Sequence, residues 1–111
     1  MSVSTHVLDT SIGRPAPAVA VSLQRQEGGA WVEISRSVTN DDGRVGALLP
    51  ATMASAPGHY RLTFDVAAYF QRRAAETFYR EVTIDFVIKD AGHYHVPLLI
   101  SPYGYSTYRG S

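Results

Sequence analysis

The residues of this sequence best suited to proton transfer near neutral pH are its four histidines. Imidazole has an ordinary pKa of about 6.5, so it can accept or release a proton in this range. His6 lies in an N-terminal segment of alternating polarity, while a single residue separates His93 from His95. Taken alone, His6 is most simply an exposed strand residue, and we interpret His59, which follows Gly58, as a surface residue.

The spacing of His93 and His95 has two interpretations. Side chains two residues apart in a strand project from the same face, here the face opposite Val96 and Leu98. Two imidazoles placed in this way can ligate zinc. The spacing alone favours two solvated histidines over a zinc site, so we predict no metal here.

Arg44 and the C-terminal segment are the other candidate functional elements. Arg44 directly follows a turn at residues 40–43, where an arginine is ordinarily a solvated charge. The segment 103–111 holds Tyr103, Tyr105 and Tyr108, and tyrosine packs well while keeping a hydroxyl group. We interpret this segment as an anchored last strand, although chain ends are usually frayed.

Composition excludes several classes of function. The 111 residues fit one domain, 1–111, with an ordinary hydrophobic fraction of 45%. The absence of cysteine excludes a disulfide scaffold and thiol catalysis, and it fits a reducing compartment. Ten basic and ten acidic residues cancel, so no net field attracts nucleic acid or an anionic membrane.

The sequence contains neither a membrane-spanning or secretory segment nor a common catalytic motif. Apolar runs stay short of the ~18 residues of a membrane helix, and residues 1–9 lack the regions of a secretory signal. We therefore expect a cytoplasmic protein. No phosphate-binding glycine loop, Gly-x-Ser-x-Gly elbow or His-Glu-x-x-His helix occurs, so no cofactor is indicated.

Short alternating segments separated by turn residues predict an all-β fold, an antiparallel sandwich or barrel. The predicted strands are residues 5–10, 19–24, 31–38, 44–49, 60–64, 82–88 and 94–100, with a final segment after Gly104. In the third strand, Val32, Ile34 and Val38 are assigned to one face together with Arg36.

One stretch has helical spacing. Its apolar residues recur at intervals of three to four, namely Val66, Tyr69, Phe70, Ala74 and Phe78. Asp65 is a suitable N-cap because its carboxylate can accept the free amide hydrogens of the first turn. We predict one short helix from Val66 to about Arg73.

Four segments together resemble the 5-hydroxyisourate hydrolase family, the enzymatic relatives of transthyretin. These are residues 4–10 with 13–16, 39–44, 93–99 and 101–111. Residues 64–79 also resemble the helix and following strand of the family, so the resemblance covers the whole chain. The ending Tyr108-Arg109-Gly110-Ser111 is the most specific element, whereas Gly13-Arg14-Pro15 recurs in many non-enzymatic sandwiches. Arg80, in place of an expected proline, and Ile100 are minor departures.

The resemblance implies a transthyretin-like (prealbumin-like) antiparallel β-sandwich of about seven to eight strands with one short helix. It also implies a homotetramer, a dimer of dimers, with the active sites in the channel between dimers. The implied catalytic residues are His6, Arg44, His95 and Ser111. Tyr108, Arg109 and Gly110 join them in the implied substrate-binding set. The implied reaction is metal-independent hydrolysis of 5-hydroxyisourate to 2-oxo-4-hydroxy-4-carboxy-5-ureidoimidazoline, a step of urate degradation in purine catabolism that needs no cofactor.

The chemistry of these residues suggests a role for each of them in hydrolysis. Either His6 or His95 removes a proton from water, and the sequence does not distinguish them. Arg44 binds the urate-like oxygens and stabilises the developing oxyanion, and its charge lowers the pKa of a neighbouring histidine. Ser111 acts through its hydroxyl or through the terminal carboxylate.

Two other functions are compatible with a sandwich fold. The first is a transthyretin-type binding protein that carries an aromatic ligand in the same channel without catalysis. The second is an adhesive domain, which the Gly13-Arg14-Pro15 stretch alone would allow. Neither needs the two histidines, Arg44 and the C-terminal motif together, so we rank both below the hydrolase.

Overall fold

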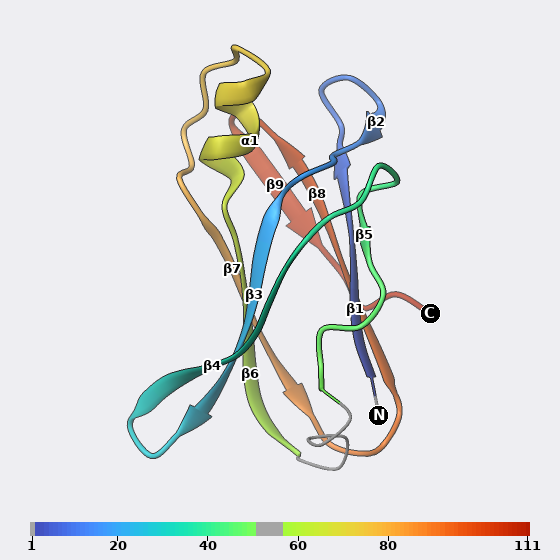
Figure 1. Ribbon diagram of the computed structural model, residues 1–111, viewed down its shortest axis with the longest axis vertical. Coiled ribbons are helices and arrows are strands. Elements are labelled where there is room, and N and C mark those ends of the chain that lie inside the picture. The colour runs from blue at the N-terminus through green and yellow to red at the C-terminus, as the bar shows by residue number, and fades with distance from the viewer. Residues whose placement is uncertain (1, 51–56) are drawn as a thin grey trace.

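The protein is a sandwich of two β-sheets with one short helix at one end (Figure 1). The computed structural model describes residues 2–50 and 57–111. The first sheet has the order β2-β1-β8-β9, with β5 also paired to β1, and the second has the order β4-β3-β6-β7. The strands of the first sheet are β1 (Ser2–Asp9), β2 (Arg14–Pro15), β5 (Arg44–Val45), β8 (His93–Ser101) and β9 (Gly104–Thr107). Those of the second are β3 (Ala20–Glu27), β4 (Ala30–Val38), β6 (Gly58–Phe64) and β7 (Val82–Ile88).

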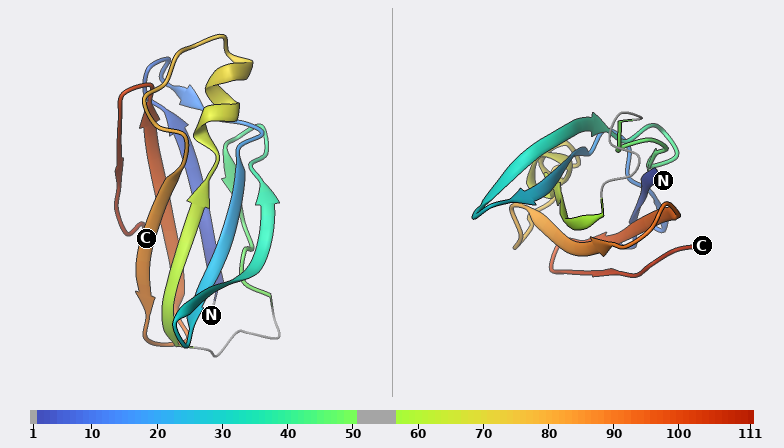
Figure 2. Two further views of the ribbon diagram at one scale, coloured as in Figure 1. Left: turned by 90° about the vertical axis from the view of Figure 1, so that its left-hand side faces the viewer. Right: turned by 90° about the horizontal axis from the view of Figure 1, so that it is seen from below.

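This architecture confirms the predicted transthyretin-like sandwich. Of the nine strands in the described ranges, β2 and β5 have only two residues each. Seven longer strands thus form the body of the two layers, which Figure 2 shows from the side and from below.

The pairing of β1 with β8 differs from the others because it is parallel. The remaining pairings between the described strands are antiparallel. In the parallel register Ser4 lies opposite His95, and His6 lies opposite Pro97. Strands from opposite ends of the chain therefore form the centre of the first sheet.

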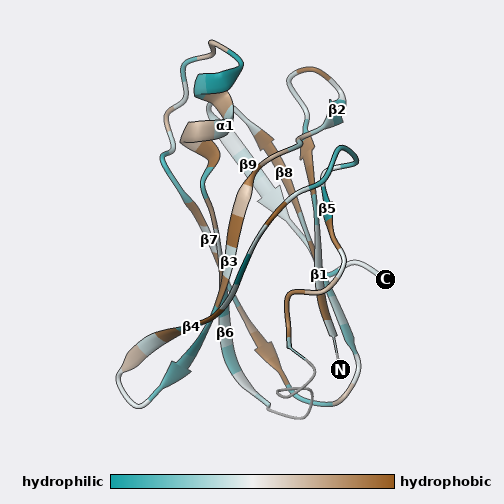
Figure 3. Cartoon of the chain, in the orientation of Figure 1, coloured by the Kyte–Doolittle hydropathy of each residue, from teal (hydrophilic) through white to brown (hydrophobic). Residues whose placement is uncertain are grey.

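The core lies between the two sheets, where alternate residues of each strand are buried. In β6, Tyr60, Leu62 and Phe64 are fully buried, as the alternation predicts. Figure 3 shows that hydrophobic residues recur along strands of both sheets. Burying such side chains contributes roughly 1.5–3 kcal/mol each, which fixes which face of every strand turns inward.

The helix α1 (Val66–Arg72) begins where the sequence predicts. The Asp65 carboxylate accepts a hydrogen bond of 3.1 Å from the Ala68 amide, which confirms Asp65 as the N-cap. The helix ends one residue earlier than predicted, because Arg73 is its C-cap and Ala74 adopts a positive φ of 55°.

A buried carboxylate ties this helix to β1. Asp9 is fully buried and accepts hydrogen bonds of 2.7 Å from both the Tyr69 hydroxyl and the Arg73 guanidinium. The amide and hydroxyl of Ser11 donate to its other oxygen. Burial and the neighbouring Asp9 raise the pKa of Tyr69 to about 12, so its hydroxyl stays protonated as a donor.

Two strand predictions were wrong in detail. The segment predicted as a strand at 44–49 pairs only at Arg44–Val45, although the Leu48 amide still donates to the Val3 carbonyl. The face assigned in β4 is broken by a shift of register between Leu23 and Gln24 on its neighbour. Val32 and Val38 are consequently 40% and 55% exposed, whereas Ile34, which was assigned to the same face, packs against the core.

Within the described ranges, no helix has both the length and the apolar character needed to cross a bilayer.

Candidate active site

The outer face of the first sheet gathers the predicted catalytic residues from separate strands. His95 on β8 lies opposite Ser4 on β1, and residues paired in a parallel register project to the same side. His6, two residues along β1, is the register partner of Arg44 on β5. The two histidines and the arginine therefore share one face of the sheet.

The turn before Arg44 fixes the position of this arginine. The Asn40 side-chain oxygen accepts hydrogen bonds from the amides of Asp42 (2.9 Å) and Arg44 (3.0 Å). Gly43 has a φ of 76°, and its carbonyl accepts the Val7 amide at 2.7 Å. A Cβ at Gly43 would lie 2.3 Å from the Val7 carbonyl oxygen, so only glycine allows the turn to dock against β1 beside His6.

The C-terminal tail runs alongside β8 and ends at the same pocket. The Thr107 hydroxyl donates to the Pro97 carbonyl at 2.6 Å, and the Gly110 amide donates to the His95 carbonyl at 2.8 Å. The chain end lies beside β1 and β5 (Figure 1) and on the outside of the sandwich (Figure 2). These backbone contacts confirm that the last residues are an anchored segment.

The converging groups surround an open pocket of about 250 Å³. Its lining residues are Ser4, Thr5, Arg44, Val45, Gly46, His93, His95 and Ser111. Three of the four predicted catalytic residues thus line one cavity. The fourth, His6, lies next to it as the partner of Arg44 but is not part of the lining, and Gly110 packs against the His95 ring.

The pKa of His95 is lowered from its ordinary value of 6.5. Burial is the largest cause, followed by the positive charge of Arg44 and by His93 and His6. Each of these disfavours the imidazolium form. His95 is therefore neutral at neutral pH, so one of its ring nitrogens carries a free lone pair.

Tyr108 and Arg109 are not among the residues that line this pocket. They line a more apolar pocket of about 280 Å³ together with residues of β7 and β8. The Arg109 guanidinium lies 4.6 Å from the centre of the Tyr94 ring and donates to the His93 carbonyl at 3.4 Å. These contacts hold the tail against β8, while a contact of Tyr108 or Arg109 with substrate stays a prediction.

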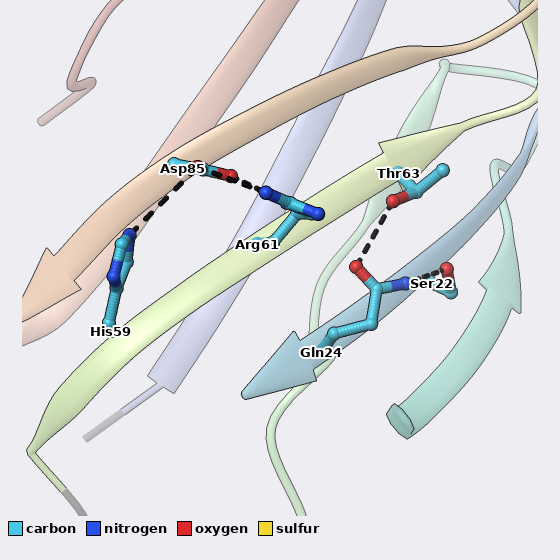
Figure 4. Close-up of polar contacts among 6 residues, drawn as sticks. All are labelled: Ser22, Gln24, His59, Arg61, Thr63 and Asp85. Atoms are coloured by element: carbon cyan, nitrogen blue, oxygen red, sulfur yellow. Dashed lines mark hydrogen bonds and ion pairs between the residues drawn. The ribbon is translucent and has the colours of Figure 1, made fainter. Parts of the chain in front are cut away.

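A second polar cluster lies on the other sheet (Figure 4). Asp85 on β7 forms two hydrogen bonds with Arg61, which lower the pKa of this carboxyl, and it lies 4.0 Å from His59. Arg61 also covers the Trp31 ring. The His59 side chain is 41% exposed, in agreement with its interpretation as a surface residue.

Two residues of the site were not predicted as functional. Ser4 and His93 line the pocket, and His93 was interpreted only as a solvated residue or a zinc ligand. No group of three or more potential metal-binding side chains is found in the described ranges. The two-residue spacings from Ser4 to His6 and from His93 to His95 were visible, but only the parallel register joins the two pairs.

Comparisons with known proteins show which family the chain belongs to and which solved structures share its fold. The model of the HIUase/Transthyretin family matches residues 3–110. A 5-hydroxyisourate hydrolase of Salmonella typhimurium is 46% identical over 110 residues, covering 98% of this chain and 80% of the relative. The structure of Klebsiella pneumoniae 5-hydroxyisourate hydrolase superposes with a TM-score of 0.88 at 41% identity and covers both chains fully. Sea bream transthyretin, solved in complex with thyroxine, has a TM-score of 0.92 at 28% identity, covering 99% of this chain and 95% of the other.

Proposed function

Because this chain belongs to the HIUase/Transthyretin family, we propose that it is a 5-hydroxyisourate hydrolase, an enzyme that opens a cyclic amide with water. The observation that carries the proposal is the convergence of Arg44, His95 and Ser111 on one pocket. A cavity for an apolar aromatic ligand alone does not need a guanidinium, an imidazole and a serine together.

In the proposed mechanism His95 is the general base. Of the two histidines it is the one that lines the pocket, and its lowered pKa keeps it neutral. His95 takes a proton from water as the water oxygen attacks the ring carbonyl carbon. The C–N bond then breaks, and the same proton passes from His95 to the departing nitrogen, which leaves a carboxylic acid and an N–H group.

Arg44 stabilises the negative charge that develops on the carbonyl oxygen during this attack. A guanidinium presents several hydrogen-bond donors in a fixed plane, a geometry suited to an oxyanion. His6 orients substrate or water from beside Arg44, and Ser111 binds at the rim through its hydroxyl or terminal carboxylate. Arg109 fixes the tail through its contacts with Tyr94 and His93.

We further propose a homotetramer, a dimer of dimers. The strands β7 and β9 are edge strands in the described part of the chain, and both contribute to the apolar pocket beside the tail. Phe78, Val87 and Tyr105, on or near these edges, are 73%, 53% and 45% exposed. Exposed apolar edges of this kind are suited to an obligate interface, which is richer in hydrophobic contacts than the rest of a surface. The open polar pocket on the first sheet would then face the channel between dimers.

Three further properties belong to the same proposal. Residues 1–111 act as one domain, the enzyme works in the cytoplasm, and hydrolysis needs neither metal nor cofactor. Chelator treatment tests the last point, because loss of turnover in a chelator would reinstate the zinc interpretation of His93 and His95. Fractionation of cells tests the location.

The decisive experiment follows the ultraviolet decay of freshly made 5-hydroxyisourate with wild type and with His95→Ala side by side. Wild type should accelerate the decay, and the variant should lose most of this acceleration. A protein that binds an aromatic ligand but leaves the decay rate unchanged would be a carrier, the alternative for which sea bream transthyretin with thyroxine is the structural precedent.

A further inference from the structure

A continuous line of hydrogen-bonding groups leads from His95 to the exposed edge of the sheet. Ser4 Oγ lies 2.8 Å from His95 Nδ1 and 3.1 Å from His93 Nε2, so this one hydroxyl bridges the two imidazoles. The other nitrogen of His93, Nδ1, bonds with the hydroxyl of Ser2. Ser4 is only 8% exposed, whereas His93 faces solvent.

The geometry limits how His95 can move. Its Nδ1 is held by Ser4, its ring stacks on His93 with centroids 6.3 Å apart and planes 11° apart, and Gly110 closes the Cδ2 side. Within the described ranges, Nε2 of His95 has no hydrogen-bond partner. Nε2 is therefore the ring nitrogen available to a molecule in the pocket.

A hydroxyl between two imidazoles permits two arrangements of the hydrogen-bonding protons, which differ in the tautomer of His95. In one, His95 Nδ1–H donates to Ser4, Ser4 donates to His93 Nε2, and His95 Nε2 carries the lone pair of a base. In the other, Ser4 donates to His95 Nδ1, and Nε2 then holds the ring proton and cannot act as a base. Only the first arrangement is compatible with hydrolysis by His95.

We propose that Ser4 and His93 are positioning residues that hold His95 in the base-competent tautomer and draw its second proton toward solvent. The inference rests on the proposed hydrolase function. When Nε2 takes a proton from water, the Nδ1 proton passes to Ser4 Oγ, and the Ser4 hydroxyl proton passes to His93 Nε2. Water loses one proton and His93 gains one. When the Nε2–H of His95 then protonates the departing nitrogen, His93 returns its proton through the Ser4 hydroxyl to His95 Nδ1, so both imidazoles end in their starting protonation states.

The surroundings of His95 favour this outward transfer. The charged or titratable groups that act on it are Arg44 from β5, His6 from β1 and His93 on its own strand, and Ser111 from the tail lines the same pocket. Arg44 disfavours a charge on His95 itself. His93 is exposed, whereas His95 is partly buried, so a proton delivered to His93 is in contact with solvent.

The first test is the tautomer of His95, which long-range ¹H–¹⁵N imidazole spectra report without any turnover. In wild type, above the pKa of His95, we expect the proton on Nδ1 and a bare Nε2. Ser4→Ala should shift the proton toward Nε2, and Ser4→Thr should restore the wild-type tautomer because it keeps the γ hydroxyl. A resting His95 protonated on Nε2 in wild type would overturn the proposal.

The second test is kinetic. Ser4→Ala should lower kcat about tenfold, a part of the roughly 10²- to 10⁴-fold that general base catalysis supplies, while KM changes little. Ser22→Ala is the matched control, because Ser22 is a similarly buried strand serine (6% exposed) on the other sheet (Figure 4). Equal kcat values for Ser4→Ala and Ser22→Ala would exclude a positioning role for Ser4.

His93→Phe separates stacking from proton transfer, since phenylalanine keeps a ring beside His95 but has no nitrogen. In mixtures of H₂O and D₂O, wild-type kcat should fall along a curve because several protons move together, and the variant should give a straight line. Identical curves for both proteins would overturn the transfer to His93. If wild type itself leaves 5-hydroxyisourate untouched, the proposed function fails, and the tautomer spectra decide separately whether Ser4 sets the protonation of His95.

Discussion

The backbone of Gly110 lies directly against the imidazole of His95. The Gly110 amide donates to the His95 carbonyl at 2.8 Å, and a Cβ at this glycine would lie 2.5 Å from ring atom Cδ2. Carbon atoms in ordinary contact are about 3.5–4.0 Å apart, so the tail takes this path only because residue 110 has no side chain. The path of the C-terminal motif and the position of the His95 ring therefore depend on each other.

Gly110→Ala should lower kcat/KM at least about tenfold, because the methyl group displaces either the His95 ring or the Ser111 end, and small misplacements cost up to about 10²-fold. Gly104→Ala is the matched control in the same C-terminal segment, since its nearest atom, Ser101 Oγ, is 3.6 Å away. Steady-state kinetics and thermal melts check both variants. Equal activity of the two would contradict the role given to the tail.

Single substitutions of the site should reduce turnover without unfolding the chain. We expect His6→Ala, Arg44→Ala and His95→Ala each to cut kcat at least about tenfold, because each removes a group that we propose to contact substrate, water or the oxyanion. Arg44→Lys keeps the charge but loses the planar donor array, so it should recover only part of the loss. Near-normal turnover in all three alanine variants would end the assignment.

The activity and the stability of the protein should both decline in acid. Because His95 has a folded pKa below 6.5, the acid limb of kcat/KM should lie below pH 6.5, and Arg44→Gln should move the His95 pKa upward in an NMR titration. Between the folded pKa and 6.5 the unfolded chain binds more protons, so stability falls as pH drops through this window and this contribution is constant below it. Urea unfolding of wild type against His95→Gln measures the difference. An acid limb above pH 6.5 would be inconsistent with His95 as the base.

The Asp9 carboxylate should be far more important for stability than the exposed Asp85. Asp9→Ala leaves the Tyr69 hydroxyl and the Arg73 guanidinium without their acceptor. Breaking such a buried pair lowers the free energy of unfolding by roughly 3–5 kcal/mol. Asp85→Ala also removes an arginine partner, but the Asp85 side chain is 44% exposed, and surface pairs contribute about 0–1 kcal/mol. Denaturant unfolding should separate the two variants clearly. Similar losses would mean that the Asp9 network is not a stabilising junction between β1 and α1.

The assembly should depend on the β7 edge. Wild type should have a native mass close to four times the 12.1 kDa chain, and Val87→Lys should weaken the assembly because it places a charge on an exposed apolar edge. Val38→Lys, on the edge strand β4 and exposed to a similar degree, should leave the native mass unchanged. A monomeric wild type would contradict the proposed tetramer and the shared channel.

Local patterns in the sequence predicted most of the elements. Alternation identified the buried face of β6 at Tyr60, Leu62 and Phe64, and Asp65 marked the start of α1, because both signals act between near neighbours. Alternation failed where the pairing with a neighbouring strand decides which face of a strand turns inward. The shift of register on β3, opposite β4, left Val38 exposed.

The spacing of residues along the sequence could not predict which side chains form the site. His95, Arg44 and Ser111 were assigned through the family resemblance, and their convergence depends on the parallel pairing of β1 with β8. No property of Ser4 alone distinguishes it from any other strand serine. Its bridging position between His93 and His95 exists only after the register of two remote strands is fixed.

That remote pairing also sets the order of events during synthesis. Hydrogen-bonded partners of β1 and β8 are about ninety positions apart, as in the Thr5 hydroxyl bound to the Val96 carbonyl across 91 residues. At roughly 5–20 residues per second, a ribosome delivers β8 several seconds after β1. During this interval the first strand of the nascent polypeptide lacks its central neighbour. Catalytic competence should therefore arise only after β8 and the tail that follows it have been synthesised, and chains that stop before β8 should have none.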